Sequence, residues 1–152
     1  MKRAIIKNIL IKKEIDADAD LSYLGEFSSN PCKLAIETNL GSNYYPYFNP
    51  TNATNKKEAK QDFDRIMSYE NGNWCMVSII AEAEIHIQHN GYSRIHHITS
   101  AGLYGIESDS DNSYFIDIAK QELADLKENL ITFNVNLKNF KQLSEEALNN
   151  LD

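Results

Sequence analysis

The hydrophobic pattern is clearest between residues 73 and 107, where it predicts two strands and a tight turn. From Cys75 to Ile87 every second residue is apolar, which is the period of a β-strand with one buried face. Asn90-Gly91 follows, a dipeptide preferred in two-residue hairpin turns. Residues 92–99 are then predicted to return as the partner strand. We expect the rest of the chain to fold around this hairpin.

Helical periodicity precedes and follows the hairpin. A helix is predicted over residues 55–70, because Asn55 and Glu58 have the spacing of a capping box and Asn71-Gly72 forms a stop signal. A second helix is predicted after the carboxylate-rich run 107–111 and extends to about Leu130. Carboxylates are favoured at such a start by the helix dipole.

Alternating apolar residues also predict a first strand over residues 3–14 and a last strand over residues 131–137. The order β-α-β-β-α-β is typical of a ferredoxin-like split sandwich of the α+β class, an antiparallel sheet with two helices on one face. We expect one domain over residues 1–152, with a long loop-rich insertion after the first strand (residues 21–55) and a short helix in a C-terminal tail (residues 139–152). This fold hosts many unrelated functions.

Charge changes the functional picture. The chain has 152 residues and a formal net charge of −7, which argues against a general nucleic-acid binder and suits a partner with a basic surface. The first 14 residues nevertheless hold five bases and one acid, a balance of +4 that leaves −11 for the remainder. A DNA mimic and an ordinary soluble acidic protein are both compatible with this composition.

Signals for other environments and for cofactors are weak. Cys32 and Cys75 lie 43 positions apart and lack a CxxC spacing, and no apolar run reaches the length of a membrane span. A reducing, cytoplasmic location with no membrane contact is therefore expected. We also expect no cofactor, because phosphate-loop and dinucleotide-binding motifs are missing from the sequence.

The polar face of the hairpin supplies the candidates for chemistry. With a two-residue turn, paired residue numbers sum to 181, so Glu84 faces His97, His86 faces Ile95 and Glu82 faces Thr99. Glu82, Glu84, His86 and His97 then share one face and are candidate catalytic residues. Glu84, His86 and His97 are also candidate metal ligands, since zinc and iron prefer such a mixture of groups. An exposed face with an ordinary cross-strand pair is the structural alternative.

Several segments resemble an uncharacterised family of small acidic proteins encoded by phages, prophages and plasmids. The run SAGLYGIESDSDNSYF is similar to a GGLWGIESDSDxSY motif of these proteins, with Ala101 and Tyr104 in place of the expected Gly and Trp. The segments DADLSYLGEF, YFNP and YENGNWCMVSIIAEAEI match further blocks in the same order. The resemblance covers about residues 16–128. It implies an accessory protein of mobile DNA and supplies no catalytic residues.

These observations lead to one main hypothesis. The chain is expected to be a non-enzymatic binding protein of a mobile genetic element that inhibits a host defence protein or complex, as an anti-CRISPR protein or DNA mimic does. Its partner is a host protein or nucleoprotein complex with a basic surface, and direct nucleic-acid binding is not expected. The expected contact residues are acids of the segment 107–125 and tyrosines of the insertion: Glu107, Asp109, Asp111, Asp117, Glu122, Asp125, Tyr44, Tyr45 and Tyr47.

Two alternatives stay open. The Glu/His face of the hairpin would serve a metal-dependent enzyme or a protein that binds a small ligand. A structural homodimer would instead pair exposed strand edges.

Overall fold

A computed structural model describes residues 2–151 and shows an α+β protein with antiparallel sheets and, within these residues, three helices and no barrel. Contacts divide the chain into two compact units. Unit 1 comprises Met1–Ala17 with Met76–Asp152, and unit 2 comprises Asp18–Cys75. The expectation of one domain over residues 1–152 stays a prediction. None of the described helices has the length and apolarity that crossing a membrane requires.

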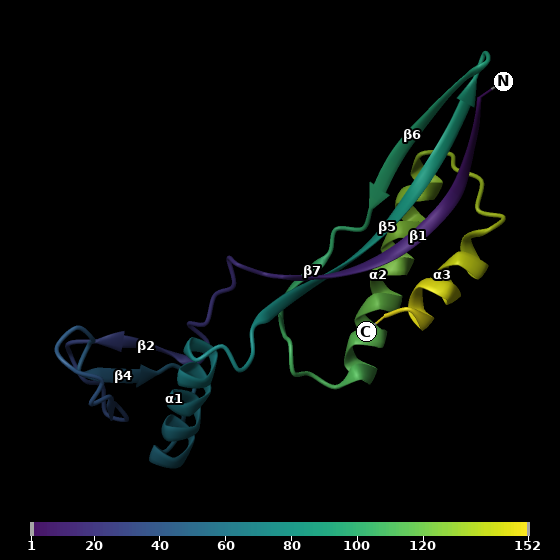
Figure 1. Ribbon diagram of the computed structural model, residues 1–152. Coiled ribbons are helices and arrows are strands. Elements are labelled where there is room, and N and C mark those ends of the chain that lie inside the picture. The colour runs from purple at the N-terminus through teal and green to yellow at the C-terminus, as the bar shows by residue number, and fades with distance from the viewer. Residues whose placement is uncertain (1, 152) are drawn as a thin grey trace. The chain divides into compact units, whose positions relative to one another are not determined.

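The sheet of unit 1 is organised around one long central strand. Strand β5 (Met76–His89) pairs antiparallel with β1 (Arg3–Ile15) along one edge. Strands β6 (Tyr92–Thr99) and β7 (Leu103–Glu107) also pair antiparallel with β5, at opposite ends of its length. Figure 1 shows β5 running between β1 and β6. The predicted hairpin is confirmed, and Asn90 and Gly91 both have the positive φ that a type I′ turn requires.

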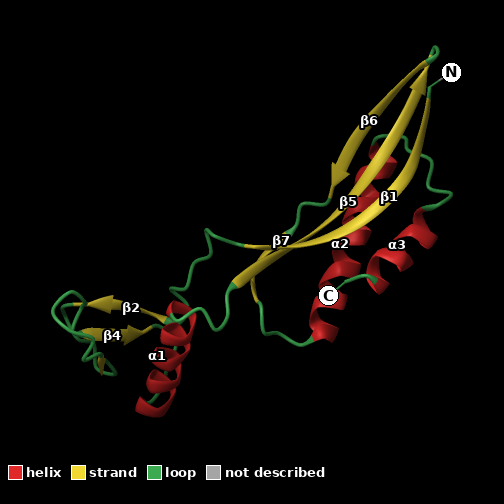
Figure 2. Cartoon of the chain, in the orientation of Figure 1, coloured by secondary structure: helices red, strands yellow, loops and turns green. Residues whose placement is uncertain are grey.

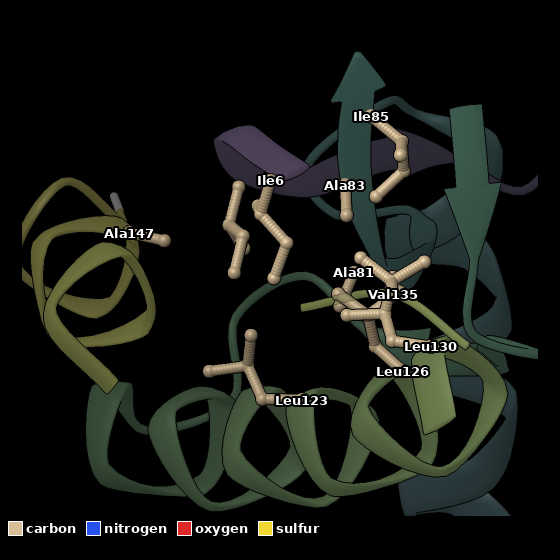
Figure 3. Packing of buried hydrophobic residues seen from close by; sticks show 10 residues of the cluster. Ile6, Ala81, Ala83, Ile85, Leu123, Leu126, Leu130, Val135 and Ala147 are labelled. Atoms are coloured by element: carbon tan, nitrogen blue, oxygen red, sulfur yellow. The ribbon is translucent and has the colours of Figure 1, made fainter. Parts of the chain in front are cut away.

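Two helices cover one face of this sheet. They are α2 (Asn112–Thr132) and α3 (Phe140–Asn149), and they pack mainly against β5 and β1 respectively (Figure 2). Ala81 and Ala83 of β5 are fully buried in this interface. Because their side chains are small, α2 packs close to the strand. Figure 3 shows this core, whose buried members are Ile6, Ile9, Ala81, Ala83, Ile85, Leu123, Leu126, Leu130, Val135 and Ala147.

The ferredoxin-like topology is not confirmed. That arrangement places the third strand of the fold beside the first, whereas here β5, the second main strand, lies between β1 and β6. The predicted strand 131–137 is also wrong. Helix α2 continues to Thr132, and only an isolated parallel bridge joins Asn136 to Ile5. Its alternation was misleading because Phe133 is 65% exposed while Val135 is buried.

Unit 2 contains a small sheet and one helix. Strands β2 (Gly25–Ser28), β4 (Tyr47–Pro50) and β3 (Ile36–Glu37) pair antiparallel in that order. Phe48 is fully buried, and its ring centroid lies 5.4 Å from that of Phe27 and 5.6 Å from that of Phe63. Gly25 is required beside it, because a Cβ there would lie 2.5 Å from the Phe48 ring. Phe27 and Phe48 of the expected insertion 21–55 therefore share an aromatic core with Phe63, which lies in the helix that follows the insertion.

Helix α1 (Lys56–Glu70) belongs to unit 2 and packs against β4 and β3. The sequence pattern had assigned this helix to the main sheet, and the second helix there is α3 instead. The start of α1 was predicted correctly, because Glu58 donates its backbone N–H to the Asn55 side chain over 2.9 Å. The Glu58 carboxylate accepts from the backbone N–H of Thr54, one residue before the cap.

Leu126→Ala tests the core of unit 1. Leu126 has no exposed surface in the cluster of Figure 3, so the truncation leaves a cavity and should lower the free energy of unfolding by about 2–5 kcal/mol. Ile131→Ala on the same helix is the control, because Ile131 is 47% exposed. Urea denaturation measures both. Equal losses in the two variants would contradict the described packing.

Candidate functional site

The polar face of the hairpin has the register that the turn predicts. Glu84 pairs with His97, His86 with Ile95, and Glu82 with Thr99. These side chains lie on the face of β5 and β6 opposite the helices, because the alternate positions of β5 are buried in the core.

Glu82 is the centre of this face. Its carboxylate accepts from Lys12 Nζ at 2.9 Å, and its other oxygen lies 3.1 Å from Nδ1 of His97. The Glu82 side chain is only 15% exposed. The hydrogen bond from Lys12 is the largest cause that lowers the pKa of Glu82, assisted by His97 and opposed by burial. The sequence did not identify Lys12 as a partner of Glu82, because no local pattern shows which strand pairs with that edge of β5.

The other two candidates form a separate pair. Nε2 of His86 lies 2.8 Å from Oε1 of Glu84, two residues earlier on the same strand. The four candidates thus divide into Glu82 with His97 and Glu84 with His86. Within residues 2–151 no three histidine, cysteine or acidic side chains are arranged to hold a metal ion. Neither Glu/His pair therefore acquires the third ligand that the metal-binding hypothesis requires.

Two of the six predicted contact acids have an internal role. Asp125 Oδ2 accepts the backbone N–H of Ala101 at 2.7 Å, and Glu122 Oε2 accepts that of Gly102 at 3.0 Å. Asp16, which the sequence did not suggest, accepts the N–H of Gly105 at 3.0 Å. Ala101 and Gly102 lie in the sharply bent segment between β6 and β7, and Gly105 lies in β7, so the three carboxylates satisfy backbone donors along this stretch.

The bend explains the glycines of this motif. Gly102 and Gly105 have φ values of 87° and 68°, and a Cβ on Gly102 would lie 2.8 Å from the side chain of Ile80. Ala101 is not among the positive-φ residues, so alanine fits there without strain. Both glycines lie in the segment that joins β6 to α2, and β7 forms inside that segment.

The remaining acids lie at the start of α2. Asp109, Asp111 and Asp117 are exposed, and Tyr114 between them is 50% exposed. Asp111 occupies the N-cap position but its side chain makes no cap hydrogen bond. We call Asp109, Asp111, Tyr114 and Asp117 the acidic end. Glu107 is half-buried in β7, and its carbonyl accepts from Ser110.

The predicted tyrosines have different environments in unit 2. Tyr44 and Tyr45 are 63% and 58% exposed, whereas Tyr47 is half-buried in β4. Thr38 holds the loop by donating its hydroxyl to the carbonyl of Tyr45 over 2.8 Å. A hollow of about 570 Å³, here called the tyrosine pocket, is lined by Phe27, Leu40, Asn43, Tyr44, Tyr45, Met67, Glu70 and Asn71.

The internal role of Asp125 predicts a contrast with Asp117. Asp125→Ala leaves the Ala101 N–H without its charged acceptor and should lower the free energy of unfolding by about 1–2 kcal/mol. Asp117→Ala, on the exposed side of the same helix, should change it by less than about 0.5 kcal/mol. Thermal and urea unfolding measure both changes, and a larger loss for Asp117→Ala would refute this division of the acids.

The lowered pKa of Glu82 predicts a pH dependence. Its contribution to stability is fully present above the ordinary value of 4.5 and is lost as the pH falls through the lower folded value. The free energy of unfolding should therefore fall more steeply from about pH 5 to about pH 3 in the native chain than in Glu82→Gln. Glu145→Gln, at an exposed position of α3, should keep the native steepness. Parallel curves for the native chain and Glu82→Gln would exclude this role.

Comparisons with known proteins assign no family. No family model matches the chain, and no match is found among curated proteins or solved structures. The resemblance to small phage, prophage and plasmid proteins therefore stays a prediction.

Proposed function

We propose that this chain is a non-enzymatic binding protein whose acidic end docks onto a basic surface of a host protein or nucleoprotein complex. In this proposal the chain serves a mobile genetic element by blocking a component of host defence. The mobile-element context comes from the sequence motifs, whereas the docking surface comes from the exposed side chains of α2.

The observation that carries the proposal is the composition of the acidic end. Asp111, Tyr114 and Asp117 are exposed at helical spacings that place them on neighbouring turns. The sequence contains no lysine or arginine between Arg94 and Lys120. Lys13 of β1 also reaches this helix, and its Nζ lies 3.9 Å from the centre of the buried Phe115 ring. Exposed carboxylates around one aromatic side chain suit a basic protein surface.

The tyrosine pocket supplies a second surface for a cationic side chain of the partner. Tyr44, Tyr45 and Phe27 present aromatic surface, and Glu70 adds a carboxylate to the lining. Aromatic faces attract cationic side chains, and a carboxylate strengthens that attraction. The pocket therefore suits an arginine or lysine side chain of the partner. Unlike the acidic end, it would combine electrostatic attraction with buried apolar area.

Charge reversal at the acidic end tests the proposal. The double variant Asp111→Lys/Asp117→Lys should weaken capture of the host partner at least about tenfold, because attraction becomes repulsion at the contact. The matched control is Glu145→Lys/Glu146→Lys, which makes the same charge change at exposed positions of α3. Tagged protein would be incubated with bacterial lysate, and the retained proteins would be quantified by mass spectrometry.

Salt dependence provides the second readout of this experiment. Binding by the native chain should fall strongly from about 0.05 M to about 0.5 M salt, because exposed charges are screened over shorter distances. Equal losses in the two double variants, or capture that salt leaves unchanged, would contradict an acidic docking surface.

A further inference from the structure

The far end of the β5–β6 hairpin carries a group of cationic and aromatic side chains. The turn at Asn90-Gly91 and the start of β1 lie together, because Arg3 pairs with Gln88 and Ala4 with Ile87. Figure 1 shows this end of the sheet projecting past the last turn of α2. We call the following side chains the basic tip: Lys2, Arg3, His89, Tyr92, Arg94 and His96.

The register shows on which face of the sheet part of the basic tip lies. His96 pairs with Ile85 and Arg94 with Ile87, so both histidine and arginine occupy positions on the helix-covered side of the sheet. Ile85 is fully buried under the helices, yet His96, Arg94 and Tyr92 are exposed. His96 is therefore exposed although it lies on the helix-covered side, because α2 packs mainly against β5 and less against the edge strand β6.

Two hollows adjoin at this end. One of about 690 Å³ is lined by Lys2, Arg3, His89, Tyr92 and the backbone turn, with Asn136 beside them. Asn136 is held there because its N–H donates to the carbonyl of Ala4 over 3.0 Å. The other hollow, of about 460 Å³, is lined by Lys2, Ile87, His89, Tyr92, Arg94 and His96.

The charges of the basic tip are not neutralised locally. No aspartate or glutamate lines either hollow. The nearest acid along β5 is Glu84, and it is bonded to His86. Among residues 2–151, Lys2, Arg3 and Arg94 form no ion pair. Lys2 lines both hollows, whereas Arg3 lines only the first and Arg94 only the second. Three permanent cations and two imidazoles thus surround the tip of the hairpin, in a chain whose net charge is −7.

We propose that the basic tip binds single-stranded nucleic acid. Lys2, Arg3 and Arg94 would contact backbone phosphates, and the ring of Tyr92, which is 78% exposed, would stack on a base. A cationic groove beside an exposed aromatic ring is the combination that single strands require, because their bases are free to stack. The expectation of no direct nucleic-acid contact rested on the net charge, which averages over the opposite ends of unit 1.

This site goes beyond the proposed function and does not depend on it. The acidic end lies at the start of α2, whereas the basic tip lies beyond that helix's last turn (Figure 1). A purified chain and an oligonucleotide suffice for the test, so its outcome is independent of any host protein.

The experiment is fluorescence anisotropy of a labelled oligothymidylate of about 12 nucleotides titrated with the full chain. The logarithm of the binding constant should fall with the logarithm of salt concentration with a slope of about −2, as three phosphate contacts to a single strand require. Arg3→Ala/Arg94→Ala should weaken binding at least about tenfold and make the slope shallower.

Tyr92 gives a readout that charge alone would not produce. Tyr92→Ala should weaken binding several-fold without changing the salt slope, and Tyr92→Phe should retain the native affinity because the stacking surface remains. Lys120→Ala/Lys141→Ala is the control, since it removes two exposed cations from α2 and α3. All exchanged side chains are exposed, and circular dichroism would confirm that the variants fold.

Three outcomes would overturn the proposal. The first is no binding of the native chain to the oligonucleotide at low salt. The second is equal weakening by the control and the Arg3/Arg94 variant. The third is binding to vesicles that contain about 30% anionic lipid, lost in Arg3→Ala/Arg94→Ala, together with no binding to the oligonucleotide. That result would assign the basic tip to a membrane surface.

Discussion

The packing of α2 on the alanine positions of β5 is the constraint on which unit 1 depends. Ala81 and Ala83 have no exposed surface, and they alternate with Glu82 and Glu84 on the opposite face. Because β5 pairs with all three other strands of its sheet, this alternation fixes which side of the whole sheet is covered. The same constraint directs the Glu/His face to solvent and leaves the last residues of the hairpin beyond the helices.

The hairpin could be predicted from sequence because its signals are local. A two-residue turn and a strict alternation determine the register, so the pairing of Glu84 with His97 follows directly. The strand order and the destination of α1 could not be predicted in this way. An amphipathic helix shows that one face is buried but not which sheet covers it. Residues 133–137 show the converse, since their alternating pattern forms only one isolated bridge, from Asn136 to Ile5 of β1, and no strand.

Part of the candidate site depends on contacts between distant segments. Asp16 reaches Gly105 across 89 positions, and Asp125 reaches Ala101 across 24. No local pattern distinguishes such a carboxylate from one that faces solvent. The acidic run 107–125 therefore looked uniform, although Glu122 and Asp125 hold the chain's own backbone. Lys12 and Glu82 show the same difficulty, because their contact depends on the pairing of β1 with β5.

We propose that partner binding takes place at the acidic end. Hydrogen–deuterium exchange of the chain, alone and bound to its captured partner, tests this proposal most directly because it locates protected backbone amides. Binding there should bring new protection over residues 107–118, with unchanged exchange in the Glu/His pairs of β5 and β6. Protection confined to residues 82–99, with none at the start of α2, would contradict it.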